Sequence, residues 1–394
     1  MSLMMTADDQ AKRFAPGWAS GDIVDHWGVC WPLHHALSKR FDYLTDRAIG
    51  SEEKATMATL ADVARHAGVA ASTVSYVLSG KRSVSAATRR RVEHSIELLD
   101  YHPHAGARAL ASSRSSIIAL VVPLRGDLYV PVMMEIAIAV TTAARRFGHD
   151  VLLLTNEEGP EVIRRVAVSA RADAMILMDV TMDDDRIPML RTVGIDGVLI
   201  GVPADTSGLA CVDMDFTAAG ELCVDQLADL GHREVAFIGE AEGVYQRRSG
   251  FAERTRSGVV GRAAARGIRV VHRPCAASHE AVAGTVTRIL DDRPDTTGLI
   301  VQNEAVIPPL LSVLRTTGRT IPEDMSVIAI CPDQVAEQTS PRLTSVPIPA
   351  EDMGRSAVEM LMRRLDDGRA QELVLLPPRL TVRGSTMRAP AGRR

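Results

Sequence analysis

The sequence predicts a small all-α headpiece followed by a larger α/β core of two lobes with parallel sheets. Between residues 57 and 103, short stretches with helical apolar spacing are separated by glycine and serine. From Ile117 onward, short continuous apolar runs alternate with helical stretches. Strands this apolar are covered on both faces, which is typical of parallel α/β sheets. At 394 residues the chain is too long for one ordinary domain.

Composition limits the class of protein. An apolar fraction of 46% supports a sizeable core, but no apolar run approaches the length of a membrane span. The N-terminus has no charged-then-apolar leader, so we expect a cytoplasmic protein with no membrane contact. The five cysteines are scattered without a CxxC pair. This pattern indicates a reducing compartment and argues against a disulfide framework or a structural metal site.

The charge is distributed unevenly. The whole chain has a formal net charge of −4, yet residues 57–116 contain eight Lys or Arg against four Asp or Glu. A basic headpiece on an acidic core is expected when only one part of a protein meets phosphate.

The headpiece begins with a helix that Thr59 caps and Gly68 ends, since glycine accepts the left-handed backbone required there. A second short helix is expected to bury Val74, Val77 and Leu78. Its outer face would then carry small and polar side chains, namely Ala71, Ser72, Ser75 and Tyr76.

A third helix is predicted to start at Ser85 as its cap, with an inner stripe of Val92, Ile96 and Leu99. Pro103 then breaks the chain, and residues 104–111 could form a short fourth helix.

Two helices joined by a tight turn suit the major groove of B-DNA, where one helix lies in the groove and the other crosses the backbone. Small side chains at Ala71 and Ser72 permit close approach to base edges. The alternative is a three-helix interaction module with a solvated basic face.

About ten strands are expected in the core, which favours two similar lobes over one large sheet. An apolar-periodic helix is predicted at 132–147. The apolar runs that predict strands are 117–122, 151–154, 174–178, 198–200, 235–238, 268–271, 298–301 and 327–330.

The headpiece resembles that of the lactose/galactose-repressor (LacI/GalR-type) family of bacterial transcription regulators. The resemblance is carried by Thr59–Ala64, Ala67–Val69 and Ser72–Leu78, and it continues through Tyr101–Leu110 into the core at Leu230–Arg233, Arg247–Phe251 and Leu343–Gly354. It covers about residues 58–388. It implies a core like that of periplasmic binding proteins, a homodimer, a double-stranded DNA operator and a small-molecule effector.

The resemblance assigns roles in DNA binding residue by residue. Ala71, Ser72 and Tyr76 match positions that face bases, and Ser75, Ser79 and Thr88 match positions near phosphates. Leu110 matches a hinge leucine that wedges into the minor groove, and Ala107 is small where two hinge helices meet. The complete set of candidates is Thr59, Ala71, Ser72, Thr73, Ser75, Tyr76, Ser79, Lys81, Arg82, Ser83, Thr88, His104, Ala107 and Leu110.

The resemblance also places an effector, often a sugar or related metabolite, between the lobes. Arg247 matches an arginine that holds effector hydroxyls or carboxylates, and Asn303 matches a polar residue that faces the ligand. Asp127 and Tyr129 are first-lobe candidates, for which a surface loop is an equal alternative. Cys331 replaces a carboxylate that typically binds sugar hydroxyls, and Asp333 is a candidate substitute.

Two departures from the family pattern concern the recognition helix. Ala70 stands where Ser or Thr usually caps the helix, and Tyr76 stands where Arg is common. A two-point contact to guanine is therefore not available at Tyr76.

Other constellations are interpreted as background. Asp183–Asp185 is expected to be a solvated turn and not a metal site, and His232 is interpreted as structural. Because no GxSxG, P-loop or GxGxxG motif is present, the sequence predicts neither an enzyme nor a cofactor.

The predicted organisation is an extension at 1–56, a headpiece at 57–103, a hinge at 104–116, a core at 117–388 and a tail at 389–394. Lobe one is expected at about 117–212 and 349–370, and lobe two at about 213–348 and 371–388. We hypothesise that the functional protein starts near Met57, which an intact mass would test. The preferred function is a repressor that its effector releases. A co-repressor-dependent regulator and a ligand-binding protein with an idle headpiece are the alternatives.

Overall fold

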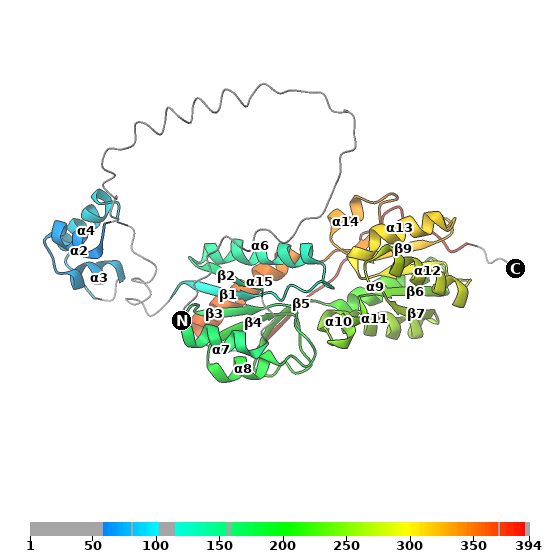
Figure 1. Cartoon of the computed structure of the whole chain (residues 1–394), viewed down its shortest axis with the longest axis horizontal. Helices are drawn as coiled ribbons and strands as arrows, with labels where there is room; N and C mark the ends of the chain where they lie inside the picture. Colours follow the sequence, from blue (N-terminus) through cyan, green and yellow to red (C-terminus); the bar gives the residue numbers. More distant parts are fainter. Residues whose placement is uncertain (1–57, 80–81, 102–114, 156–158, 369–370, 391–394) are drawn as a thin grey trace, which may run out of the picture. The chain divides into compact units, whose positions relative to one another are not determined.

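The computed structural model describes residues 58–79, 82–101, 115–155, 159–368 and 371–390. The predicted extension and residues 104–114 of the predicted hinge lie outside these ranges. In the headpiece, α2 (Leu60–Ala67), α3 (Ala71–Ser79) and α4 (Ala86–Leu98) confirm the predicted helices (Figure 1). Gly68 adopts a φ of +63° and ends α2 as expected. Ser85 caps α4 by accepting a hydrogen bond from the Thr88 backbone N–H.

The headpiece core differs from the prediction in two places. Leu78 is 37% exposed, because one step of the helix turns it about 100° away from the buried Val77. In α4 the buried partner of Val92 is Ser95, while Ile96 and Leu99 are only half-buried. The Ser95 hydroxyl donates to the Arg91 carbonyl at 2.8 Å and lies 3.0 Å from His66 Nδ1, so its polar group is satisfied inside the small core.

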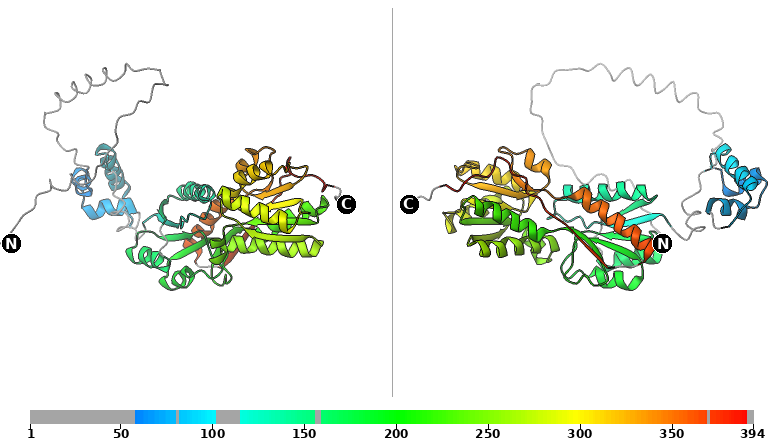
Figure 2. Two further views of the ribbon diagram at one scale, coloured as in Figure 1. Left: turned by 45° about the vertical axis from the view of Figure 1, so that its right-hand side comes forward. Right: turned by 180° about the vertical axis from the view of Figure 1, so that it is seen from behind.

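Lobe one is a parallel sheet with helices on both faces. Helices α6 (Val130–Arg146) and α15 (Ala350–Asp367) pack side by side on one face, and α7 (Pro160–Ser169) and α8 (Arg186–Val193) cover the other (Figure 2). The strands, in sheet order, are β11 (Glu372–Leu376), β5 (Ala210–Met214), β4 (Asp196–Ile200), β3 (Ala174–Leu177), β1 (Ile117–Val121) and β2 (Asp150–Leu154).

Lobe two repeats this design. Helices α9 (Phe216–Asp229) and α11 (Gly250–Arg266) cover one face of its sheet, and α12 (His279–Asp292) and α13 (Ile307–Thr316) cover the other. Short helices α10 (Glu242–Gln246), η1 (Glu304–Val306) and α14 (Asp333–Glu337) follow three of the strands. The parallel strands, in sheet order, are β10 (Thr344–Val346), β9 (Ser326–Ile330), β8 (Gly298–Val301), β6 (Glu234–Gly239) and β7 (Arg269–Pro274).

The predicted lobe boundaries were wrong in two places. Both β5 and β11 belong to lobe one, because β11 pairs in parallel with β5 at the edge of that sheet. Lobe two therefore begins with α9, and the chain returns to it only after Leu376. From there the C-terminal segment runs along lobe two, where the Val327 N–H donates to the Ser385 carbonyl and the Ala389 N–H to the Leu230 carbonyl.

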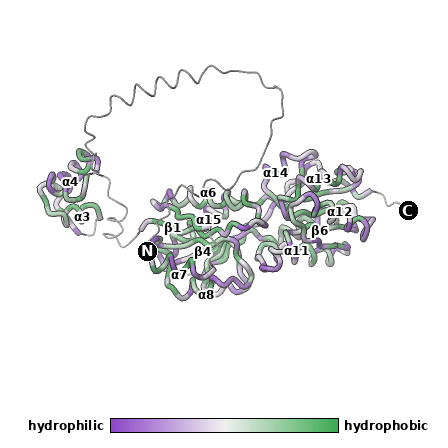
Figure 3. Tube along the Cα trace, viewed as in Figure 1, coloured by the Kyte–Doolittle hydropathy of each residue, from purple (hydrophilic) through white to green (hydrophobic). Residues whose placement is uncertain are grey.

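Three strands escaped the sequence patterns. Strand β5 contains the charged Asp213, β10 has only three residues, and β11 is an edge strand that alternates between half-buried and exposed side chains. Apolar residues otherwise concentrate in the strands and the inner helix faces (Figure 3). Helices α9 and α11 approach closely because Gly258 has no side chain; a Cβ there would lie 2.1 Å from the Thr217 carbonyl oxygen. None of the helices in the described ranges is long and apolar enough to cross a membrane.

Candidate functional site

The exposed face of α3 carries the residues that the sequence pattern placed there. Ala71 and Ser72 are exposed, Tyr76 is 36% exposed, and Thr73 and Ser75 are half-buried. This face presents small side chains and one aromatic hydroxyl, which suits contact with base edges and phosphates.

Arg82 lies over the Tyr76 ring, with its guanidinium carbon 5.6 Å from the ring centroid. A cation–π contact of this kind keeps a positive charge at the edge of the α3 face. Thr59 and Ser83 are exposed, and the Thr88 hydroxyl lies 2.9 Å from Ser85 Oγ. The remaining DNA-contact candidates fall outside the described side chains: Ser79, Lys81, His104, Ala107 and Leu110.

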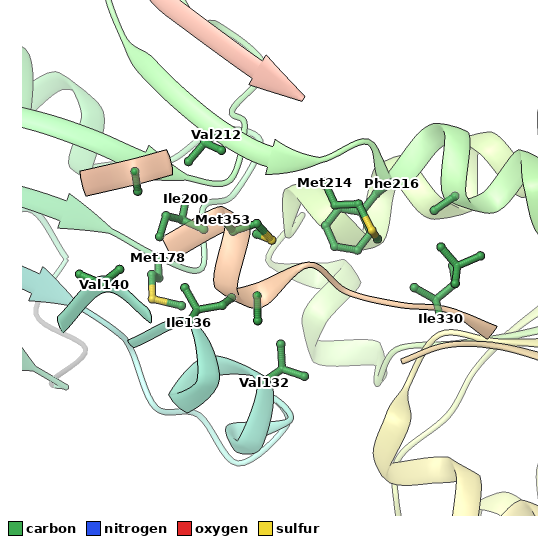
Figure 4. Packing of buried hydrophobic residues seen from close by; sticks show 14 of the residues in the cluster. Val132, Ile136, Val140, Met178, Ile200, Val212, Met214, Phe216, Ile330 and Met353 are labelled. Atoms are coloured by element: carbon green, nitrogen blue, oxygen red, sulfur yellow. The ribbon is translucent and has the colours of Figure 1, made fainter. Parts of the chain in front are cut away.

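A cavity of about 100 Å³ lies between the two lobes. It forms where strands of both sheets reach their carboxyl ends, as expected for ligand sites in open α/β sheets. Figure 4 shows part of its apolar wall, in which Ile136, Met178, Phe216 and Ile330 converge from both lobes. The apolar lining consists of Leu128, Tyr129, Val132, Met133, Ile136, Met178, Val180, Ile200, Phe216, Phe251, Ile330, Ile348 and Met353.

The polar side chains of the cavity are Asp179, Asp213, Glu240, Gln302 and Glu304. Burial raises the pKa of Glu304 to about 8 and that of Asp213 to about 7. Burial, reinforced by the charge of Glu304, raises the pKa of Glu240 well above its usual value. These acids therefore retain protons at neutral pH more readily than exposed carboxyl groups do.

Two of the predicted effector residues bind each other across the lobes. Arg247 donates from Nη1 to Asp127 Oδ2 at 2.7 Å and from Nη2 to Asp127 Oδ1 at 2.9 Å. The hydrogen bonds from Arg247 hold the pKa of Asp127 below its usual value. Of the six effector candidates, only Tyr129 lines the cavity, two residues after Asp127.

The other three effector candidates lie in lobe two, away from the cavity lining. The Asn303 amide donates to the Cys275 carbonyl and accepts from the Ala305 N–H, which caps η1. Cys331 is fully buried in the apolar core of lobe two and does not line the cavity. Asp333 forms an ion pair with Arg383 at 2.6 Å. Their neighbours Gln302, Glu304 and Ile330 line the cavity instead.

Sequence reasoning missed Glu240, Gln302 and Glu304. Each follows the end of a lobe-two strand by one to three positions, and this position was the available signal. The family resemblance instead predicted that the neighbouring Asn303 faces the ligand.

The expected solvated turn at Asp183–Asp185 was also wrong for its central residue. Asp184 is only 7% exposed and accepts hydrogen bonds from Nε and Nη2 of the buried Arg186. Arg186 also donates to the carbonyls of Met178 and Asp179. The Asp184–Arg186 ion pair therefore stabilises the backbone that follows β3. Asp179 itself is ion-paired with Arg125 and has a φ of +50°. His232 fits its structural interpretation, since it is buried between Thr297 Oγ1 and the Met387 carbonyl.

A short backbone contact joins the lobes near the cavity. The Met182 N–H donates to the Arg248 carbonyl at 2.8 Å, and the Gly250 N–H donates to the Val180 carbonyl at 3.0 Å. Arg248 is also ion-paired with Asp183. Lobe two therefore contacts the end of β3 immediately beside Arg247.

A helical headpiece with a polar recognition face, joined to two α/β lobes around a cavity, defines a ligand-responsive DNA-binding regulator. Residues 59–104 match the family described as "Bacterial regulatory proteins, lacI family", and residues 224–386 match "Periplasmic binding protein-like domain". The chain is 30% identical to the HTH-type transcriptional regulator CelR of Thermobifida fusca, over 79% of this chain and 93% of that protein. It is 24% identical to Catabolite control protein A of Staphylococcus aureus, over 83% and 99% of the two chains.

Solved structures share the architecture. The transcriptional regulator CelR–cellobiose complex matches with a TM-score of 0.59 and 28% identity, over 83% of this chain and 99% of that one. The Lac repressor dimer bound to operator and an anti-inducer matches with a TM-score of 0.72 and 22% identity, over 84% and 99%. The chain belongs to the lacI family of bacterial regulatory proteins and is a DNA-binding transcription regulator.

Proposed function

We propose that this regulator is a homodimeric cytoplasmic repressor that a small molecule in the interlobe cavity releases from a pseudo-palindromic operator. The Asp127–Arg247 ion pair is the observation that carries this proposal, because it makes the arrangement of the lobes depend on groups beside the cavity. A ligand that binds one lobe arrangement better than another shifts the population toward it.

The headpiece supplies the output of this switch. The α3 face offers Ala71, Ser72 and Tyr76 to the major groove, and Arg82 adds charge beside it. Asp127, Tyr129 and Arg247 are the proposed link to the effector. Since the Lac repressor in the operator-bound structure is a dimer, we propose a dimer that reads two half-sites.

An operator selected in vitro from genomic fragments would allow a direct test. Operator affinity would be measured by fluorescence anisotropy with and without candidate effectors. Sugars come first, since the related CelR structure is a complex with cellobiose. Release on ligand addition supports a repressor, whereas tighter binding would establish the co-repressor alternative. Failure to prefer the selected fragment over random DNA would contradict the proposed function.

A further inference from the structure

The cavity between the lobes is lined by several carboxyl groups but by no basic side chain of the described residues. Among the described side chains that line it are four carboxyl groups and one amide, but no Lys, Arg or His. Two of these carboxyl groups, those of Asp179 and Asp213, have cationic neighbours that do not line the cavity. Asp179 is ion-paired with Arg125, and the charge of Arg254 partly offsets the burial of Asp213.

Glu240 and Glu304 differ from these two acids. Each is at most 7% exposed, and no described side chain forms a hydrogen bond or an ion pair with either carboxyl group. A hydrogen bond from the Glu304 backbone N–H only partly offsets the burial of that carboxyl group. The charged groups nearest to them are also acidic. Glu304 lies within electrostatic reach of Glu135, and Glu240 lies within reach of Asp127 and of Glu304 itself. The neighbouring Tyr245 hydroxyl accepts from the Glu240 backbone N–H, and among the described side chains no hydrogen bond joins this hydroxyl to the Glu240 carboxyl group.

Gln302 provides an independent sign of a missing donor. Its side chain is 2% exposed and lines the same cavity. Its Nε2 donates to Thr255 Oγ1 at 3.0 Å, and the Thr255 hydroxyl donates its own proton to the Phe251 carbonyl. Thr255 can therefore only accept from Gln302, which fixes the amide orientation. The remaining amide oxygen, Oε1, is buried and accepts no hydrogen bond.

Buried acceptors without donors are costly unless a ligand supplies the donors. An ammonium group offers three donors and no acceptor, and its positive charge matches the Glu240–Glu304 pair. Aromatic faces complete the environment, because Phe216 and Phe251 line the cavity with ring centroids 5.7 Å apart. A carboxylate or phosphate ligand would instead place a negative charge beside two buried acids and oppose their ionisation.

We propose that the ligand of this cavity is a compact organic amine that places its ammonium group between Glu240 and Glu304. Its donors also reach Gln302 Oε1, and its carbon skeleton packs on the apolar wall. An amino sugar belongs to this class as well as a simple arylalkylamine. This inference rests on the proposed function only in treating the same cavity as the effector site.

The test uses the full chain and matched probes that differ in one group. Glucosamine is compared with glucose, and benzylamine with benzyl alcohol, by isothermal titration calorimetry near pH 7 without DNA. Each amine is expected to bind at least about tenfold more tightly than its neutral counterpart, as for a charge-assisted hydrogen bond. Titrations in buffers of different ionisation enthalpy should show proton release, because the bound cation favours the ionised carboxyl groups.

Two variants, Glu240→Gln and Glu304→Gln, are expected to remove the preference for amines. Glu280→Gln is the matched control, since Glu280 is exposed on α12. Equal or tighter binding of the neutral probes would overturn the proposal, as would unchanged amine binding in both cavity variants. Binding by none of the probes at millimolar concentration would also overturn it.

A separate measurement of operator affinity distinguishes failure of the proposed ligand class from failure of the proposed regulatory function. If amines bind through Glu240 and Glu304 but leave operator affinity unchanged, the ligand class stands and the effector role in the proposed function fails. If the chain shows no preference for its selected operator, the regulatory proposal fails whichever probe binds.

Discussion

The carboxylate of Asp127 and the guanidinium of Arg247 form a two-point ion pair between the lobes, with N–O distances of 2.7 and 2.9 Å. Both side chains are about a quarter exposed, at 27% and 28%. The pair therefore gains from partial burial but is still screened by solvent, so we expect a coupling energy of about 0.2–1 kcal/mol.

A double-mutant cycle tests this ion pair. Asp127→Asn and Arg247→Gln should each lower the free energy of unfolding, and the double variant should lose less than the sum of the two effects. Denaturant unfolding of the three variants provides the measurement. The Arg191–Asp205 pair, which lies within lobe one, serves as a control: its loss should leave the coupling energy between Asp127 and Arg247 unchanged. Additive effects at Asp127 and Arg247 would show that the contact does not couple the lobes.

The buried Glu304 predicts a pH dependence of stability. Its pKa in the folded protein is raised to about 8 by burial, so between the ordinary value of 4.5 and about 8 the folded state holds a proton that the unfolded chain has released. Stability from this group is therefore greatest at low pH and falls as pH rises through that window. Denaturation midpoints at about pH 5.5 and about pH 8.5 should differ less in Glu304→Gln than in the wild type. An unchanged difference would contradict the raised pKa, while Glu280→Gln should behave as the wild type.

On the α3 face, Tyr76→Ala is expected to weaken operator binding by roughly tenfold, since losing the match at one base pair of a site typically costs about 1–3 kcal/mol. Fluorescence anisotropy with operator and random duplexes would separate a loss of sequence specificity from a general loss of DNA affinity. Leu98, which is 60% exposed on α4, provides the control: Leu98→Ala should bind operator as the wild type does. Loss of affinity in both variants would indicate an unfolded headpiece and would not support a role for Tyr76.

Two glycines of α11 offer a matched test of close packing. A Cβ at Gly258 would meet the Thr217 carbonyl oxygen at 2.1 Å, whereas a Cβ at Gly261 would meet nothing within 4 Å. Gly258→Ala should therefore destabilise the core by about 1–3 kcal/mol. Gly261→Ala should be stabilising by roughly 0.5–1 kcal/mol, since alanine favours the helix. The melting temperatures of both variants are measured by thermal unfolding. Equal melting temperatures would refute the close contact between Gly258 and the Thr217 carbonyl oxygen.

The class of fold follows from local patterns in the sequence. Apolar runs as short as 117–122, alternating with helical stretches, predict buried strands, and Gly68 and Ser85 set helix boundaries through local backbone chemistry. These features depend on neighbours in sequence, which a pattern records directly. The outward face of α3 followed from the same helical periodicity.

The set of side chains that meet at the cavity depends on tertiary packing. Asp127 and Arg247 are 120 positions apart, and their ion pair arises only when the lobes come together. Asn303 and Glu304 are adjacent in the chain, yet the first caps a helix and the second lines the cavity. Strand β11 likewise joined lobe one through its pairing with β5. Such contacts depend on the packing of distant elements, and that is why local periodicity predicts the frame of this regulator but not the chemistry of its ligand.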